Sequence, residues 1–339
     1  MNPERIGIYY DLMNNGIDLQ SISAFPGEPH RFCKLNSRCY MLETVCGKYA
    51  LWLVSEEEPL FLARLKLLRV LEDEAIKGFL FPVQLKTNRF YHVLEDGRLF
   101  YITKWPELRR ISFRNDLESL LKLAIDFRKV MSLHKLSFLK FKEQPKMLID
   151  KYHDMLISIK NFAMLANYRL HPTRFDRLFL ECWEEVYQEA GQALDLIRSS
   201  PYLDLIGTKE FIQPIINDFS RSNLRTLPND QAICISLKKS VPDLAIIDLA
   251  LLMVKTGRAN RWSRDWYNKI IEVYNKSFPL TDEELEITRA YLAFPWELYR
   301  LASRYYHNRV NWPVSVFVEK LERILKSDRE RKDLLLDLY

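Results

Sequence analysis

Asp218 and Asn223 are the residues whose types and spacing most directly suggest chemistry. A loop aspartate can accept the proton of a hydroxyl group, and an asparagine five residues later can bind the Mg²⁺ that neutralises the phosphates. The pattern D-x-x-x-x-N is by itself a weak indication of phosphoryl transfer, in which Asp218 would be the catalytic base and Asn223 a metal ligand. The pattern arises readily by chance, and a polar turn whose side chains cap backbone amides is the structural alternative.

The two residues lie in a segment that interrupts a largely helical part of the sequence. From Arg114 onward the apolar periodicity is helical, and Phe211 to Ser240 breaks it with short apolar runs around a polar turn. The predicted helices are Asn115–His134, Gln144–Leu165, Thr173–Ser199, Pro242–Lys255, Ser263–Ser277, Thr281–Tyr306 and Pro313 to about Leu336.

The first ~105 residues have a different pattern, typical of an antiparallel sheet with one helix. Turn sequences join short segments rich in Tyr, Val, Leu and Thr into two hairpins, and a helix runs from Pro59 to about Lys77. The hairpin strands are Arg38–Val45 with Lys48–Val54, and Phe90–Leu94 with Arg98–Thr103. We therefore expect an α+β, bilobal protein with an antiparallel-sheet lobe over residues 15–105 and a large, mostly helical lobe over 106–339.

The amino-acid composition of the chain argues against several classes of function. The 339 residues carry a net charge of +5, which does not favour nucleic acid as a partner. Glycine is scarce, with 9 residues, so a glycine-lined phosphate loop is disfavoured. The 5 cysteines lack C-x-x-C spacing, which indicates reduced thiols rather than disulfides or zinc. No signal core and no apolar run of about 18 residues occurs, so we expect a cytoplasmic protein without a membrane span.

Several segments, taken in order, resemble the CotS family of spore-coat-associated proteins, within the aminoglycoside phosphotransferase and choline kinase superfamily. They are Gly47–Leu51, Thr103–Pro106, Leu133-His134, Asp218 to Asn223, Asp248–Ala250, Phe294–Glu297 and Arg304–Tyr306. The resemblance runs from about Asp18 to Leu325. It implies a protein-kinase-like fold, a mother-cell protein deposited in or near the endospore coat, and other coat proteins as partners.

The kinase site that this resemblance implies is degenerate. The family's phosphate-contacting lysine is replaced by Trp52, and its metal-binding aspartate by Ser236. No glycine-rich loop precedes the first hairpin, the helix centre Ala63–Leu67 lacks a glutamate, and Ile216-Asn217 replaces the His-Gly before Asp218. Losing the lysine and the carboxylate removes most electrostatic stabilisation of a transferring phosphoryl group.

We therefore expect a pseudokinase with a structural or scaffolding role and no bound cofactor. The rival hypothesis is a divergent, ATP- and Mg²⁺-dependent small-molecule phosphotransferase that uses Asp218 as base and Asn223 as metal ligand, with Lys238 or Lys239 replacing lost charge. A third hypothesis is a regulatory partner that binds a true kinase homologue through the cleft.

Other candidate residues have structural alternatives. Asp248 is expected to cap a helix or tie down the preceding loop, and His134 to close a helix. Trp52 either occupies the vacated nucleotide pocket or packs in the sheet. The aromatic residues from Tyr291 to Tyr306 are expected in the core. The basic clusters are treated as surface, with docking on acidic coat components as the alternative: Arg258, Arg261, Arg264, Lys326, Arg329, Arg331 and Lys332.

Overall fold

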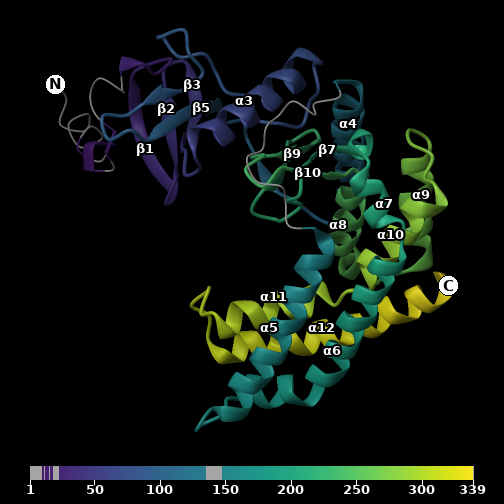
Figure 1. Ribbon diagram of the computed structural model, residues 1–339. Helices are drawn as coiled ribbons and strands as arrows, with labels where there is room; N and C mark the ends of the chain where they lie inside the picture. Colours follow the sequence, from purple (N-terminus) through teal and green to yellow (C-terminus); the bar gives the residue numbers. More distant parts are fainter. Residues whose placement is uncertain (1–9, 11, 15, 18–22, 135–146, 339) are drawn as a thin grey trace. The chain divides into compact units, whose positions relative to one another are not determined.

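The computed structural model describes residues 10, 12–14, 16, 17, 23–134 and 147–338 (Figure 1). These residues form two compact units, which we describe separately. Unit 1 comprises the described residues up to Ile111 together with Ser220–Ser240. Unit 2 comprises the described residues of Ser112–Ser137, Glu143–Phe219 and Val241–Tyr339. The predicted Gln144–Leu165 helix begins outside the described residues.

Unit 1 contains an antiparallel five-stranded sheet in the order β1-β2-β3-β5-β4. Its strands are β1 (Pro29–Asn36), β2 (Cys39–Thr44), β3 (Gly47–Leu53), β4 (His92–Val93) and β5 (Leu99–Lys104). Gly47 has a φ of 121° in the β2–β3 turn, a conformation that favours glycine. The two predicted hairpins are thus confirmed, whereas β1 was not predicted.

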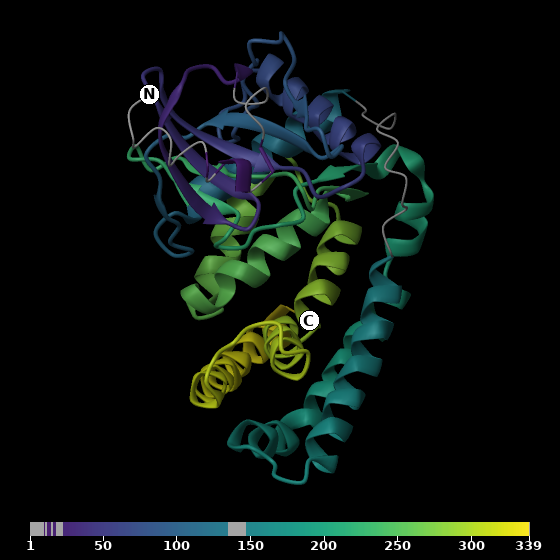
Figure 2. The ribbon, with the colours of Figure 1, turned by 90° about the vertical axis from the view of Figure 1, so that its left-hand side faces the viewer.

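Helix α3 (Glu58–Asp73) packs against this sheet (Figure 2). Pro59 lies in its first turn, where the missing N–H costs nothing. Phe61 and Leu65 form an apolar cluster with Leu99 of β5, so the apolar face of the helix and the sheet share one core. The predicted lobe-one helix is confirmed, and the packing fixes α3 against the strand that carries Tyr101 and Thr103.

A second sheet shows why Ser220–Ser240 belongs to unit 1. Strands β8 (Leu224–Thr226) and β9 (Ala232–Cys234) form an antiparallel hairpin, and β8 also pairs with β6 (Arg109–Arg110). Cys234 additionally donates its backbone N–H to the carbonyl of Gly78 at 2.8 Å. The interruption predicted over Phe211 to Ser240 therefore contains a small hairpin that belongs to unit 1, whereas its first residues, with β7 (Ile212–Ile215), belong to unit 2.

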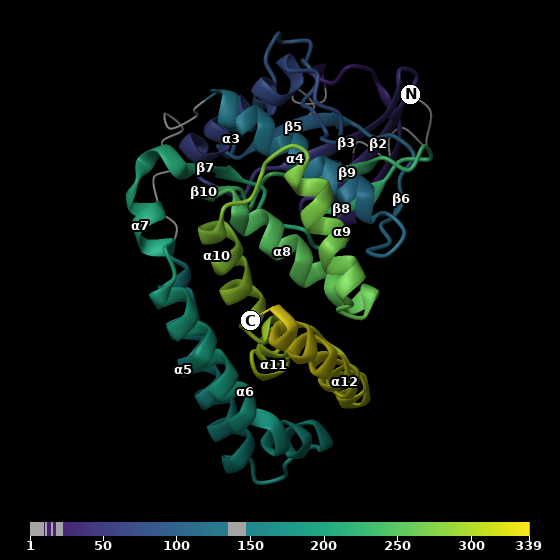
Figure 3. The same cartoon turned by 90° about the vertical axis from the view of Figure 1, so that its right-hand side faces the viewer.

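Unit 2 is mostly helical (Figure 3). In chain order it contains α4 (Leu117–His134), α5 (Leu148–Tyr168), α6 (Arg174–Ser199), α7 (Tyr202–Gly207), η1 (Lys209–Phe211), β7 (Ile212–Ile215), β10 (Val241–Leu244), α8 (Ile246–Gly257), η2 (Arg258–Asn260), α9 (Arg264–Asn275), α10 (Asp282–Ala293), α11 (Trp296–Tyr306) and α12 (Val314–Leu338). Helices α5 and α6 lie side by side along most of their length. No helix within the described residues is both long and apolar enough to cross a membrane.

Two predicted helix boundaries in unit 2 are wrong. Residues Val241–Leu244 pair with β7 as strand β10, so the helix predicted from Pro242 starts only at Ile246. The single helix predicted over Thr281–Tyr306 is two helices, because Pro295 has no N–H and disfavours a helical conformation at the preceding residue.

The aromatic residues around this break are buried, as predicted. Tyr291, Phe294 and Trp296 pack on one another, with ring centroids 4.7 Å apart for Phe294 and Trp296 and 4.8 Å for Tyr291 and Trp296. Tyr305 and Tyr306 pack around Phe175 of α6. These rings join α6, α10 and α11 into one core.

Arg331 was predicted to lie on the surface, and this prediction is wrong. Its side chain is buried on α12 and donates to the carbonyls of Leu292 and Ala293 at 2.9 and 2.7 Å. It also pairs with Glu189 at 2.8 Å and with Asp328 at 2.7 Å. The last carbonyls of α10 lack intrahelical partners, and the Arg331 guanidinium satisfies two of them.

Candidate functional site

Trp52, at the position predicted to lack the phosphate-contacting lysine, lies on β3 in unit 1. Its indole Nε1–H donates to Thr103 Oγ1 at 3.0 Å, and its ring stacks on Tyr101 with centroids 6.3 Å apart. It lies 6.1 Å from the Trp105 ring and packs against an apolar cluster of Leu80, Ile233 and Ile235. The indole thus packs between the sheet and the chain around β9.

Asn223 has its side-chain amide in hydrogen bonds that hold the hairpin together. Oδ1 accepts the backbone N–H of Ser236 at 3.0 Å, and Nδ2 donates to Cys234 Sγ at 3.3 Å. The residue is only 7% exposed. The oxygen that would bind Mg²⁺ therefore already has a structural role.

Ser236 presents a hydroxyl where the resemblance implies a metal-binding carboxylate. Its Oγ accepts the backbone N–H of Lys238 at 3.1 Å, which fixes the turn after β9. A neutral hydroxyl is a weak ligand for Mg²⁺ beside the carboxylates that this ion usually takes.

A charged group in unit 1 was missed by the sequence analysis. Arg64 lies in the segment of α3 where the resemblance implies a glutamate, and it forms a largely buried ion pair with Glu56. The Lys238 ammonium donates to Ser55 Oγ. Burial lowers the pKa of the Lys238 ammonium, and so does the positive charge of Arg38. Lys238 and Arg38 therefore lie near one another. The basic residues between Leu60 and Leu71 were the signal that could have indicated Arg64.

Asp218 lies in unit 2, in the loop that follows β7. Its backbone environment is set by Asp248 in the first turn of α8, whose carboxylate accepts the N–H of Ile216 at 2.6 Å and of Asn217 at 2.8 Å. Burial raises the pKa of Asp248 to about 7, although both N–H donors favour its charged form. Asp248 was predicted to cap a helix or tie down the preceding loop; it instead holds the loop that follows β7, and the N-cap of α8 is Ala245.

Asn217 has a φ of 54°, in the left-handed region. Asparagine tolerates this conformation better than other residues with a Cβ. The glycine implied by the resemblance is therefore replaced by a residue that keeps the required backbone. The loop geometry before Asp218 does not depend on glycine.

Charged residues of two helices lie near Asp218. Lys255 of α8 and Arg300 of α11 both interact electrostatically with the Asp218 carboxylate. Arg258, directly after α8, pairs with Glu297 of α11 at 3.5 Å. Arg258 was predicted to be part of a basic cluster, whereas neither Lys255 nor Arg300 was predicted as a candidate residue.

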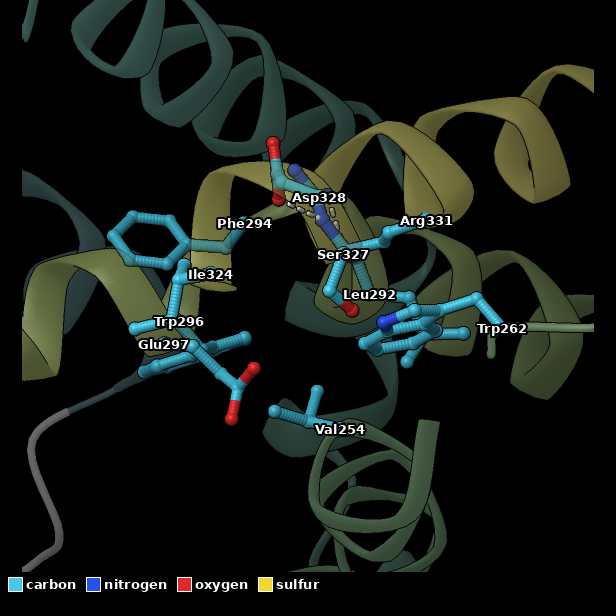
Figure 4. Close-up of a pocket in the computed structure, with 10 residues that line it drawn as sticks. All are labelled: Val254, Trp262, Leu292, Phe294, Trp296, Glu297, Ile324, Ser327, Asp328 and Arg331. Atoms are coloured by element: carbon cyan, nitrogen blue, oxygen red, sulfur yellow. Dashed lines mark hydrogen bonds and ion pairs between the residues drawn. The ribbon is translucent and has the colours of Figure 1, made fainter. Parts of the chain in front are cut away.

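A cavity in unit 2 adjoins this group, and Figure 4 shows the Glu297 carboxylate turned toward it. Its volume of about 20 Å³ accommodates about one water molecule. Ser327 Oγ, also turned toward the cavity, has no hydrogen-bond partner among the described residues. The cavity is lined by Val254, Trp262, Leu292, Phe294, Trp296, Glu297, Ile324, Ser327, Asp328 and Arg331. It is too small for a metabolite, and no group of three or more His, Cys, Asp or Glu in the described residues could hold a metal ion.

The arrangement of strands and helices matches solved kinase structures. An aminoglycoside phosphotransferase from Alicyclobacillus acidocaldarius superposes with a TM-score of 0.78 over 94% of each chain, at 16% sequence identity. The chain has the aminoglycoside phosphotransferase-like kinase fold. A spectinomycin phosphotransferase bound to AMP superposes at 0.70 over 98% of each chain, with 11% identity. A microcompartment-associated aminopropanol kinase superposes at 0.61 over 91% of this chain and 93% of its own, with 10% identity.

At these identities the likeness establishes the kinase-like fold alone. No protein-family profile matches the sequence. No curated protein matches it either.

Proposed function

We propose that this kinase-fold protein is a pseudokinase with a structural or scaffolding role in the endospore coat, where other coat proteins are its partners. The packing of Trp52 carries the proposal. In related kinases with an intact site, the resemblance places a lysine here to contact the phosphates. The indole offers no cation, and its contacts with Tyr101, Trp105 and the cluster around Ile233 give it a role in packing.

Two further observations in unit 1 support the loss of catalysis. The Asn223 amide holds Ser236 and Cys234, so the hairpin uses the retained motif residue structurally. The helix that would supply a glutamate instead carries Arg64, paired with Glu56. Without a lysine and a metal carboxylate, each lost group costs on the order of 10²–10³ in rate.

Nucleotide binding tests the proposal. Calorimetric titration of the full chain with ATP, with and without Mg²⁺, is expected to show no magnesium-dependent binding. Turnover of ATP with candidate hydroxyl compounds is expected to stay at the uncatalysed rate. Magnesium-dependent ATP binding together with turnover would overturn the pseudokinase assignment.

Coat deposition is tested separately. A fluorescent fusion in sporulating cells is expected to accumulate around the forespore, and crosslinking is expected to recover coat proteins. A fusion spread evenly through the mother cell would contradict the scaffolding role while leaving the loss of catalysis untouched.

A divergent phosphotransferase is the second candidate, and two observations favour it. Lys238 brings positive charge to the unit that carries Trp52, beside Ser55 and within electrostatic reach of Glu56. Asp248 and the left-handed Asn217 keep an ordered loop before Asp218. An active enzyme should lose turnover on Asp218→Asn, whereas a scaffold should be unchanged.

A further inference from the structure

Four cations of unit 2 form a group that we call the basic cluster: Lys255, Arg258, Arg300 and Arg304. Arg300 and Arg304 are four residues apart on α11 and share one face of that helix. Lys255 and Arg258 are three residues apart, at the end of α8 and the start of η2. The ion pair of Arg258 with Glu297 at 3.5 Å joins the two elements.

The cluster carries more positive charge than its surroundings neutralise. Asp218 and Glu297 are the acids that act on both Lys255 and Arg300, and Glu297 also pairs with Arg258, so the four basic side chains share two carboxylates. Within the described residues, neither the Lys255 ammonium nor the Arg300 guanidinium forms a hydrogen bond or an ion pair. The Arg300 guanidinium instead lies over the Trp296 ring, 5.2 Å from its centroid.

Lys255 and Arg300 are half-buried, and holding these two cations partly away from water is costly unless an anion pairs with them. Burial, together with the charges of Arg300 and Arg304, lowers the pKa of Lys255 to about 7, against the opposing effect of Asp218 and Glu297. Burial likewise lowers the pKa of Arg300. A bound anion would relieve both the repulsion and the missing hydrogen bonds.

We propose that the basic cluster beside Asp218 binds a compact oxyanion, the phosphate or carboxylate group of a small molecule. The guanidinium and ammonium donors match the geometry of such oxygens, and arginine binds them with two parallel hydrogen bonds. A ligand that carries an ammonium group would meet net positive charge here. Binding of the anion requires no nucleotide. If the protein is a pseudokinase, the site senses a ligand; if it is an active enzyme, the site holds the acceptor substrate.

Calorimetric titration of the full chain at low salt tests the site, with inorganic phosphate and succinate as separate probes. We expect saturable binding of at least one probe, weakened about tenfold or more by Lys255→Met. Arg304→Gln, at an exposed position where folding is not at stake, should weaken binding in the same direction. Binding of phosphate alone assigns phosphorylated ligands, and binding of succinate as well extends the site to carboxylates.

Two control variants locate the binding. Lys276→Met removes an exposed lysine of unit 2 that pairs with Glu272, and Lys48→Met removes an exposed lysine of unit 1 that pairs with Glu43. Both should leave probe affinity unchanged. The proposal is overturned if neither probe binds, if Lys255→Met and Arg304→Gln both bind like the parent, or if the controls lose affinity equally. Circular dichroism of each variant confirms that it is folded.

Discussion

Replacing Trp52 with alanine should measure how much unit 1 depends on the indole at the position where the resemblance implies a lysine. The change removes the hydrogen bond to Thr103, worth about 1 kcal/mol. It also removes ring contacts with Tyr101 and Trp105, at about 0.5–1.5 kcal/mol each. A fully buried tryptophan would cost about 3–5 kcal/mol, and the half-buried Trp52 should cost about 3 kcal/mol.

Hydrogen exchange can report this loss for unit 1 alone. The backbone N–H groups of Cys234 and Ile235 donate to Gly78 and Asn223, both at 2.8 Å, so they are protected while the hairpin is closed. Their protection should fall by the ~3 kcal/mol worked out above. Trp52→Phe, which keeps a ring and loses the hydrogen bond, should lose about half as much. A loss under about 1 kcal/mol for alanine, or equal losses for both variants, would refute the packing role.

Three further outcomes are expected in unit 2. Asn217→Gly should keep stability in urea, whereas Asn217→Val should lower it by about 1–2 kcal/mol, because its φ of 54° suits a β-branched residue poorly. Burial raises the pKa of Asp243 to about 6 and of Asp248 to about 7, so between pH ~4 and 7 the folded state binds more protons than the unfolded state. The urea midpoint should therefore fall as pH rises through this window, and Asp243→Asn should flatten the decline; a rising midpoint with no effect of Asp243→Asn would contradict this. Arg331→Met should cost about 3–5 kcal/mol, measured by urea denaturation, because it leaves buried partners without their cation, while the exposed Lys326→Met should cost almost nothing; equal losses would contradict the buried role.

The sequence predicted those parts of the fold that depend on local pattern. Turn residues such as Gly47 and the apolar face of α3 set the first hairpin and its covering helix. The predictions were wrong where a segment that is distant in the sequence determines the local structure. Val241–Leu244 is a strand because β7 offers it hydrogen bonds, and its own residues fit a helix start as well. Pro295 was a local signal for the break between α10 and α11 that the helical periodicity masked.

The residues of the candidate site likewise fall into those that the sequence indicated and those that it did not. The replacements proposed at Trp52 and Ser236 follow from the sequence alone, because the resemblance assigns a motif residue to each of these positions. The pairing of Arg64 with Glu56, and the approach of Lys255 and Arg300 to Asp218, depend on elements folded next to one another. Arg331 was predicted to be on the surface because its charge does not reveal that two carbonyls at the end of α10 accept hydrogen bonds from it.

The attachment of Ser220–Ser240 to unit 1 affects how the chain folds as it leaves the ribosome. Strand β6 emerges with Arg110, yet its partner β8 and the β9 segment beneath Trp52 follow more than a hundred residues later. At roughly 5–20 residues per second, the nascent first unit must wait several seconds for its last strands. During that interval the Trp52 indole and Leu80 lack their β9 cover, which makes this stretch of synthesis the natural point for a chaperone to engage.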